Sequence, residues 1–308
     1  MRVAAIHFAA RDINLYEFER PDGSRLPSAE PGAHIDLHLP TGMVRQYSLV
    51  SSGHELASYT IGVKRDPNSR GGSRYIHDGL KAGDLVNISQ PRNNFPLHPG
   101  AEHSVLLAGG IGITPIWCMA QQLIKDGRSW ELHYACRTRA DAAFLNSLQE
   151  SGRAHVNFDD ESGGDFLDMA AIVAEAPAGS HFYCCGPIPM LEAYRRATKA
   201  FPLEQVHLEY FSPPSASADF SGLILELARS KKILTVRAGK TILEVVRASG
   251  VSVVSSCEQG ICGACETKVL SGIPDHRDTI LSDAEKEEGK TMMICCSGAK
   301  SDKLVLDL

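Results

Sequence analysis

Four cysteines restrict the possible folds of this chain more than any other feature of its sequence. Three share one short loop and the fourth follows far downstream, in the spacing C-x4-C-x2-C-x29-C (Cys257, Cys262, Cys265 and Cys295). This is the plant-type spacing for a [2Fe–2S] cluster, in which four thiolates hold two irons. A structural zinc site usually pairs two short Cys-x2-Cys elements, so the spacing favours iron over zinc. Adjacent Cys296 competes with Cys295 as fourth ligand, and spacing alone leaves both open.

The remaining composition narrows the class of protein. The chain has 308 residues, of which 43% are hydrophobic and 22% charged, and this indicates a globular protein of two or three domains. Its nine cysteines are an odd number without a secretory signal, which argues against a disulfide framework. A net charge of −6 gives no basic excess, so we expect no nucleic-acid partner.

Two further segments bear on location. Residues 1–7 pass directly into an alternating pattern without the apolar core of a signal peptide. Residues 104–124 are 21 residues without a charge, which is long enough for a membrane span. However, glycines and a proline lie in the middle of this stretch, so a buried strand, a glycine-rich turn and a helix explain it better. We therefore expect a soluble cytoplasmic protein with no membrane partner.

Residues 1–98 have the pattern of an all-β domain. Short alternating or apolar runs are separated by turn clusters, which indicates a small barrel or sandwich. The expected strands cover residues 13–18, 34–39, 47–50, 59–63 and 85–88.

From about residue 99 the expected strands alternate with helices. This alternation predicts βαβ units and a parallel sheet over residues 99–211. The expected strands are 104–108, 130–135, 155–158 and 181–184, and the expected helices are 115–125, 140–149, 166–174 and 188–200.

A segment rich in Pro, Ser and Ala at 212–221 predicts a linker to a small domain over residues 222–308. In this domain, residues 223–227 and 233–236 predict a hairpin. Thr241, with Glu244 three residues later, predicts a capped helix over 241–249, directly before the cysteine loop.

Several motifs occur in one order along the chain. They are Arg-Gln-Tyr-Ser-Leu at 45–49, Gly-Gly-Ser at 71–73, Gly-Gly-Ile-Gly-Ile-Thr-Pro at 109–115, Cys-Gly-Pro at 185–187, the cysteine loop, and Pro-Asp-His-Arg-Asp at 274–278. In this order the chain resembles the phthalate dioxygenase reductase family, the flavin iron–sulfur reductases that serve Rieske-type oxygenases. The resemblance covers nearly the whole chain. It implies an N-terminal antiparallel β-barrel that binds FMN, a parallel α/β domain that binds NADH, and a C-terminal β-grasp ferredoxin domain, and it favours Cys295 as fourth cluster ligand.

The first domain contains candidate flavin residues. Arg45 offers a fork of donors to a phosphate, and the glycine-rich start of an expected helix at 74–80 favours an anion. By the resemblance, Arg45 lies at the FMN phosphate, Tyr47 along the ring system and Ser48 near the redox-active nitrogen. An ordinary strand and a plain loop are the alternatives. The resemblance assigns further FMN contacts to Gln46, Val63, Lys64, Arg65, Gly71, Gly72, Ser73 and Arg74. Phe211 either closes over the flavin or packs as a core residue.

Two strand ends of the second domain predict a nicotinamide site. A glycine-rich turn between a strand and a helix can hold a pyrophosphate at the helix start, and ligands of α/β sheets bind at strand ends. The expected contacts are Gly109, Gly110, Ile111, Thr114, Pro115, Cys185, Gly186, Pro187 and Arg137. The resemblance places Cys185 by the nicotinamide, and a buried core thiol is the alternative. Arg139 follows the second strand, where an arginine could meet a 2′-phosphate, but the resemblance favours NADH.

Electron counting gives the expected role. NADH gives up two electrons as a hydride, a [2Fe–2S] cluster takes one, and FMN does both. We therefore expect a monomeric NADH-dependent reductase whose protein partner is a Rieske-type oxygenase of the ring-dioxygenase or O-demethylase type. No general acid–base pair or catalytic triad is required, and His276 fits a polar turn better than a base. The alternatives are a redox sensor without turnover, and a flavin reductase in which the cluster is incidental.

Overall fold

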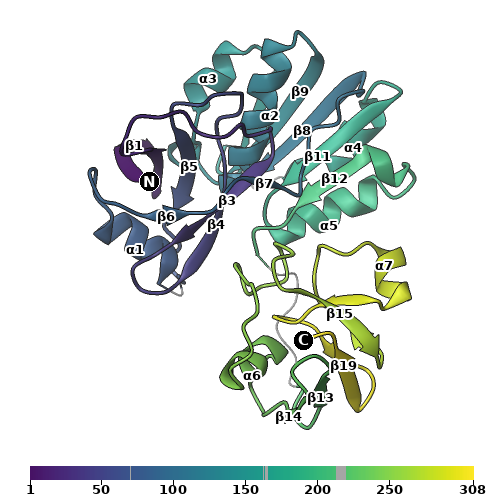
Figure 1. The fold of residues 1–308 in the computed structure, drawn as a ribbon. Helices are drawn as coiled ribbons and strands as arrows, with labels where there is room; N and C mark the ends of the chain where they lie inside the picture. Colours follow the sequence, from purple (N-terminus) through teal and green to yellow (C-terminus); the bar gives the residue numbers. More distant parts are fainter. Residues whose placement is uncertain (70, 162, 164–165, 213–219) are drawn as a thin grey trace. The chain divides into compact units, whose positions relative to one another are not determined.

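The computed structural model describes all residues except 70, 162, 164–165 and 213–219. The described chain divides into two compact units, Met1–Phe211 and Ser212–Leu308 (Figure 1). Most of the linker that we expected over 212–221 lies outside the described residues. The boundary that we expected near residue 98 falls inside the first unit and stays a prediction.

The first part of this unit consists of two antiparallel sheets. One has the order β1 (Arg2–Ala10), β2 (Ile13–Glu19), β5 (Tyr59–Lys64). The other has the order β4 (Val44–Ser48), β3 (Ala33–His38), β6 (Asn87–Ile88), and β7 (Arg92–Asn93) also pairs with β3. The helix α1 (Gly72–Gly79) follows β5.

Single bridges connect these two sheets, from Leu49 to Ile61 and from Arg2 to Leu85. The expected antiparallel β architecture is therefore confirmed, but no continuous ladder closes it into a ring within the described residues. The reason is local, since β4 ends at Ser48 and a segment of bends follows before β5. Alternating side chains fill the interior, where Phe18, Ile35 and Leu37 are fully buried.

The second part of the unit is a five-stranded parallel sheet, as expected. Its order is β10 (Ala154–Phe158), β9 (Ser129–Cys136), β8 (His103–Gly109), β11 (Ser180–Cys185), β12 (Val206–Glu209). Core residues of α2 (Ile113–Lys125) and α3 (Leu145–Glu150) pack on one face of the sheet. Those of α4 (Met169–Glu175) and α5 (Ile188–Ala197) pack on the other (Figure 1).

Some helix boundaries differ from the prediction. The helix expected over 140–149 begins only at Leu145, because Phe144 takes a left-handed backbone with φ of 62°. Short 3-10 turns lie at η1 (Gly110–Gly112), η2 (Arg139–Asp141) and η3 (Leu203–Gln205). The helix expected from 166 begins at Met169, where the Asp168 carboxylate accepts from the free N–H groups of Ala170 and Ala171.

The second unit has a mixed five-stranded sheet. Its order is β14 (Lys232–Thr235), β13 (Ile224–Leu227), β19 (Lys303–Leu306), β15 (Glu266–Ser271), β17 (Thr291–Met293). The helix α6 (Ile242–Ala248) packs on it and has the expected capping box of Thr241 and Glu244. The remaining elements are β16 (Pro274–Asp275), α7 (Asp283–Glu288) and β18 (Gly298–Ala299).

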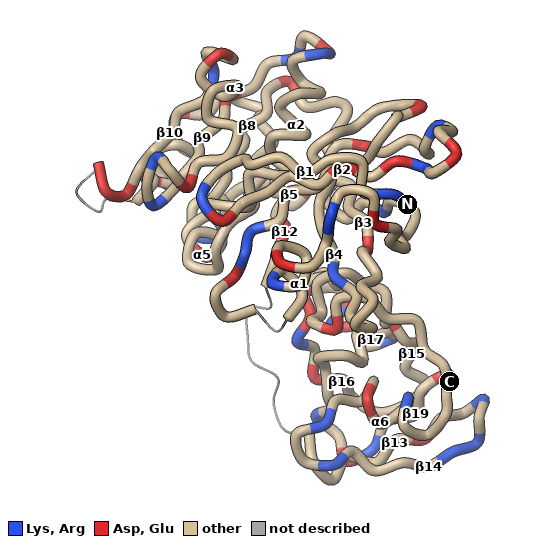
Figure 2. The backbone as a smooth tube through the Cα atoms, turned by 90° about the vertical axis from the view of Figure 1, so that its left-hand side faces the viewer, with Lys and Arg blue, Asp and Glu red and all other residues tan. Residues whose placement is uncertain are grey.

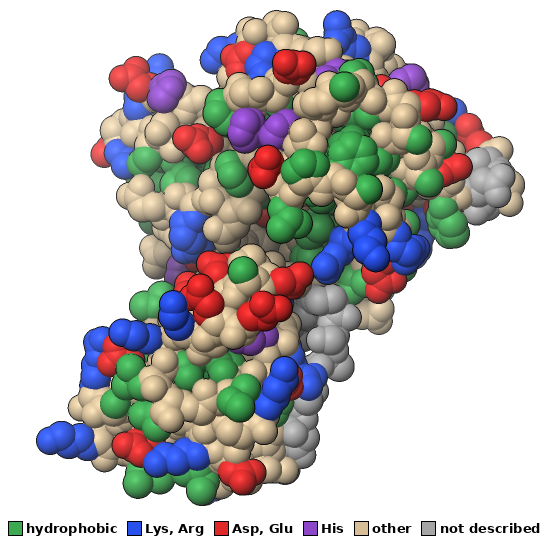
Figure 3. Space-filling view, turned by 90° about the vertical axis from the view of Figure 1, so that its right-hand side faces the viewer, with side chains coloured by type: hydrophobic (Ala, Val, Ile, Leu, Met, Phe, Trp, Pro, Cys, Tyr) green, Lys and Arg blue, Asp and Glu red, His purple; other side chains and the backbone are tan. Residues whose placement is uncertain are grey.

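Charged side chains of both signs are interspersed along both units (Figure 2). The helix α7 is mainly acidic, with Asp283, Glu285, Glu287 and Glu288 around Lys286, and acidic side chains gather on this part of the second unit (Figure 3). None of the helices in the described part of the chain is long and apolar enough to cross a membrane.

Candidate functional site

Arg45 and the start of α1 come together in the first unit. Arg45 is the second residue of β4, and a Cβ on Gly72 would overlap the Arg45 side chain. Gly71 caps α1 with φ of 102°, a backbone that a side chain would strain. The Arg45 side chain therefore lies beside the start of an eight-residue helix, and its guanidinium donates to the Val44 carbonyl and the Met43 sulfur. The guanidinium and the helix N–H groups are donors of the kind that bind a phosphate.

The other expected flavin residues surround this position. Tyr47 packs against the core of the β part, and burial raises the pKa of its phenol, which stays neutral. Val63 is fully buried in β5, and its carbonyl accepts from His77 at 2.9 Å. Arg65 pairs with Asp78 at 2.9 Å. Gln46 and Ser73 are half-buried, and Lys64 and Arg74 are exposed.

The carboxyl ends of β8 and β11 form the centre of the parallel sheet edge. A Cβ on Gly109 would lie 2.6 Å from Pro187, and one on Gly112 would overlap the Cys185 carbonyl. The order of the strands along the chain also reverses here. From β8, the sheet continues to β9 and β10 on one side, and to β11 and β12 on the other side. Such switch points are where open α/β sheets bind ligands. The expected nicotinamide residues 109–111 and 185–187 are thus brought together.

Of the other predicted contacts, Thr114 and Pro115 are buried and Phe211 is half-buried. Thr114 is 2% exposed, and its hydroxyl donates to the Ile111 carbonyl at 3.0 Å. Pro115 is buried in α2, so the exposed surface of this turn comes from Gly110 and Ile111. Phe211 is half-buried and packs against the core around α2.

Glu209, at the end of β12, is a candidate that sequence reasoning missed. It lies directly opposite Cys185 in the sheet, and its Oε2 accepts from the Ser48 hydroxyl at 3.2 Å. Burial raises the pKa of Glu209 to about 8, against the lowering effect of this hydrogen bond. Burial and, second, the charge of Glu209 raise the pKa of Cys185. A proton-carrying carboxyl therefore joins the Ser48 and Cys185 motifs.

The two arginines after β9 differ in their surroundings. Arg139 is paired with Glu161 through bonds of 3.0 and 3.2 Å, and its guanidinium lies 4.5 Å from the centre of the Phe158 ring. Arg137 is exposed, and its carbonyl accepts from the Asp160 N–H. Since Arg139 already has an acidic partner, the local charge does not favour a 2′-phosphate.

The four predicted cluster ligands are buried and meet two by two. Cys257 contacts Cys262, and Cys295 contacts Cys265 and, second, Cys296; these contacts and burial raise the pKa of Cys257 and Cys295. No group of three His, Cys, Asp or Glu side chains in the described residues could hold a single metal ion. Two thiol pairs fit two irons with two thiolates each better than one tetrahedral zinc.

Cys296 contacts Cys295 and packs against Gly260 of the cysteine loop. Its sulfur occupies the place that a Cβ on Gly260 would take, and Gly260 has φ of 74°. Its thiol contacts the Met293 carbonyl and the Ser297 hydroxyl, each at 3.7 Å. Cys295 is 3% exposed and contacts Cys265, whereas Cys296 is half-buried.

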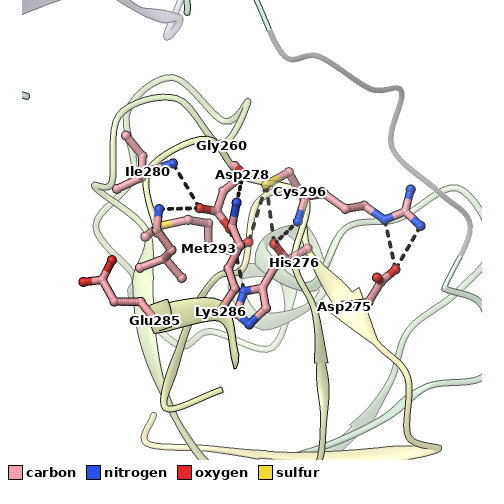
Figure 4. Close-up of polar contacts among 12 residues, drawn as sticks. Gly260, Asp275, His276, Asp278, Ile280, Glu285, Lys286, Met293 and Cys296 are labelled. Carbon is pink, nitrogen blue, oxygen red and sulfur yellow. Dashed lines mark hydrogen bonds and ion pairs between the residues drawn. The ribbon is translucent and has the colours of Figure 1, made fainter. Parts of the chain in front are cut away.

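Asp278 organises the segment beside this loop (Figure 4). Its Oδ1 accepts from the backbone N–H groups of Ile280 and Leu281 at 3.1 and 2.9 Å, and its carbonyl accepts from Lys286. The Gly260 carbonyl accepts from the Thr279 N–H at 3.0 Å. Asp278 thus orders the segment that follows the Pro-Asp-His-Arg-Asp motif, and Thr279 of this segment bonds to the cysteine loop.

Comparisons with known proteins agree with these sites. The model for the 2Fe-2S iron-sulfur cluster binding domain matches residues 225–300, and that for the oxidoreductase NAD-binding domain matches residues 106–196. Phenoxybenzoate dioxygenase subunit beta of Ectopseudomonas oleovorans is 50% identical over 100% of this chain and 97% of that protein. Tetrachlorobenzoquinone reductase of Sphingobium chlorophenolicum is 48% identical over 100% of this chain and 97% of that protein.

A solved structure extends the likeness to the whole fold. The structure of phthalate dioxygenase reductase, described as modular for electron transfer from pyridine nucleotides to [2Fe-2S], is 40% identical. It superimposes with a TM-score of 0.78 and covers 100% of this chain and 97% of that one. Full-length identity at this level leaves one assignment, and the chain belongs to the phthalate dioxygenase reductase family of oxidoreductases.

Proposed function

We propose that this chain is the reductase component of a two-component Rieske-type oxygenase, which takes hydride from NADH and passes on single electrons. The observation that carries the proposal is the two-by-two pairing of buried thiols, in a chain whose first unit has a nicotinamide-type sheet edge. A hydride donor and a one-electron centre in one protein need a group between them that handles both. FMN, when bound, supplies that conversion.

The first unit would hold FMN through charge and shape. Arg45 and the N–H groups of Gly72 and Ser73 would bind its phosphate, and the neutral Tyr47 ring would lie along the flavin. Ser48 would contact the redox-active edge. The remaining contacts would come from Gln46, Val63, Lys64, Arg65, Gly71 and Arg74, and Phe211 would cover the ring.

The sheet edge would position the dinucleotide. Gly109 and Gly186 lack side chains and pack closely against each other beside Cys185, which is fully buried, and Pro187 fixes the start of α5. The nicotinamide would lie over these two glycines. Gly110 and Ile111 would face the pyrophosphate, with the buried helix start at Thr114 and Pro115 behind them and Arg137 at the end of β9. We propose NADH rather than NADPH, because Glu161 neutralises Arg139.

The second unit would hold the cluster through Cys257, Cys262, Cys265 and Cys295. Contact between Cys295 and Cys265, and the smaller exposure of Cys295, support Cys295 rather than Cys296 as fourth ligand. The electron acceptor is an oxygenase of the ring-dioxygenase or O-demethylase type, which the dioxygenase subunit among the relatives supports. The protein acts as a monomer in the cytoplasm.

Anaerobic reduction by NADH tests this function. The purified protein should contain one FMN and two irons, and NADH should bleach the flavin and produce the electron paramagnetic resonance (EPR) signal of a reduced [2Fe–2S] cluster. Steady NADH oxidation with cytochrome c excludes a sensor without turnover, and FMN retained through gel filtration excludes a flavin-releasing reductase. A protein without iron, or one that NADH does not reduce, would refute the proposal.

The quinone reductase among the relatives supports a second candidate, in which a quinone takes electrons directly from the flavin. Cys262→Ser separates the two. If the cluster is the outlet, the variant loses reduction of both cytochrome c and quinone. If the flavin is the outlet, quinone reduction survives.

A further inference from the structure

A row of polar side chains crosses the otherwise apolar β part of the first unit. His34 of β3 lies directly opposite Ser48 of β4 on one side and Arg92 of β7 on the other. Directly opposed residues point to the same face of a sheet, with Cβ atoms about 4.5–5.5 Å apart. Ser48, His34 and Arg92 therefore stand side by side across three strands.

The His34 imidazole is buried without a hydrogen-bond partner. The residue is 1% exposed, and neither ring nitrogen has a partner among the residues that the structure describes. Leaving a buried polar group unpaired costs about 1–3 kcal/mol, so an apolar residue would pack here at lower cost. A histidine in this position therefore points to a role other than packing.

Two charged groups neighbour this imidazole. Arg92 donates to Asp36 at 2.7 Å, and Asp36 lies two residues along β3, on the same face as His34. Burial and, second, the Arg92 charge lower the pKa of His34 to about 4, against the raising effect of Asp36. The resting imidazole is thus neutral, with one nitrogen that accepts a proton and one that donates. The Arg92 side chain is 39% exposed, so the row reaches solvent there.

The Ser48 end of the row meets Glu209 at the carboxyl end of β12 in the parallel sheet. Ser48 is 4% exposed, and its hydroxyl donates to the Glu209 carboxyl. The raised pKa of Glu209 leaves this carboxyl largely protonated near neutral pH. The Glu209 carboxyl, the Ser48 hydroxyl and the His34 imidazole thus form a row from the end of β12 to the Arg92–Asp36 pair.

Proton balance requires such a route under the proposed function. NADH becomes NAD⁺ by releasing two electrons and one proton in total. The cluster accepts the electrons one at a time and no proton, so one proton per NADH must leave the buried site. We propose that His34 relays this proton from the Ser48–Glu209 pair to solvent at the Arg92–Asp36 pair. His34 acts through Ser48 and touches neither NADH nor the cluster.

The test compares electron release with proton release in the holoprotein. After anaerobic reduction by NADH, ferricyanide removes the electrons while a pH-indicator dye in weak buffer records the proton. His34→Phe keeps a flat ring without nitrogens, and His34→Gln serves if the first variant loses FMN. His38→Phe is the matched control, because His38 lies on the same strand and face but is exposed.

In the His34 variants, NADH should reduce the flavin at the wild-type rate within about twofold. Proton release should slow roughly tenfold, less than the ~10²–10⁴ of a primary acid–base group because water replaces part of the relay. The solvent deuterium isotope effect on that step should also increase. Wild-type proton release in both His34 variants, or equal slowing in His38→Phe, would overturn the proposal.

A second readout needs no turnover. Infrared difference spectra against Glu209→Gln isolate the Glu209 carboxyl stretch in the resting protein, and its hydrogen–deuterium exchange should slow in the His34 variants only. Unchanged exchange would count against the relay. If NADH did not reduce the wild-type protein, the proposed function would fail while this readout still decided the relay.

Discussion

The raised pKa of Glu209 makes a quantitative prediction about stability. The carboxyl is held at the end of β12 by one hydrogen bond from Ser48, and burial raises its pKa from 4.5 to about 8. One pKa unit corresponds to about 1.4 kcal/mol, so ionising this group in the folded protein costs about 5 kcal/mol more than in the unfolded chain. Glu209→Gln removes the ionisation and keeps the shape.

The sign follows from proton linkage. Between pH 4.5 and about 8 the folded state binds this proton and the unfolded state does not, so stability falls as pH rises and levels off above 8. The pKa rises from 4.5 to about 8, and about two pH units of this interval lie above pH 6. The free energy of unfolding of Glu209→Gln, relative to wild type, should therefore increase by about 3 kcal/mol from pH 6 to pH 9.

Urea unfolding followed by tryptophan fluorescence measures this difference. Both tryptophans, Trp117 and Trp130, lie in the first unit, so the signal reports the unit that contains Glu209. Glu192→Gln on the exposed surface of α5 is the control and should stay within about 0.5 kcal/mol of wild type at both pH values. An equal difference between Glu209→Gln and wild type at pH 6 and pH 9 would refute the reasoning.

Three further changes have direct measurements. Gly112→Ala places a Cβ on the Cys185 carbonyl and should cost about 1–3 kcal/mol in urea unfolding and slow flavin reduction by NADH; an unchanged midpoint contradicts the overlap. Cys262→Ser should lose the cluster EPR signal while NADH still reduces the flavin, whereas Cys118→Ser in the first unit keeps both; a surviving signal removes Cys262 from the ligands. Asp278→Ala leaves two N–H groups unpaired and should speed the loss of iron to a chelator. Asp302→Ala, at an exposed position, is the control, and equal rates of iron loss in the two variants would show that Asp278 does not stabilise the cysteine loop.

The elements that sequence predicted well are those whose own residues specify them. The continuous apolar run of β8 marks a buried parallel strand, and Thr241 with Glu244 marks the start of α6 from local hydrogen bonds alone. The cysteine spacing likewise carries its chemistry within one loop.

What could not be predicted depends on pairing between distant strands. Glu209 looks like an ordinary charge at a strand end, and only its position opposite Cys185 and beside Ser48, 161 residues away, gives its carboxyl a raised pKa. His34 is similar, because its neighbours come from β4 and β7. The left-handed backbone at Phe144 also has no local signal, since bulky side chains rarely adopt it.

The place of β19 in the second unit has a consequence for biosynthesis. This strand is the third of five, parallel to β13 and antiparallel to β15, so the sheet cannot be completed until residue 306 has been synthesised. The cysteine loop at 257–265 leaves the ribosome earlier, before the strand that completes the sheet of this unit. The core that packs around Cys265 and Cys295 can therefore be completed only after nearly the whole unit has been synthesised.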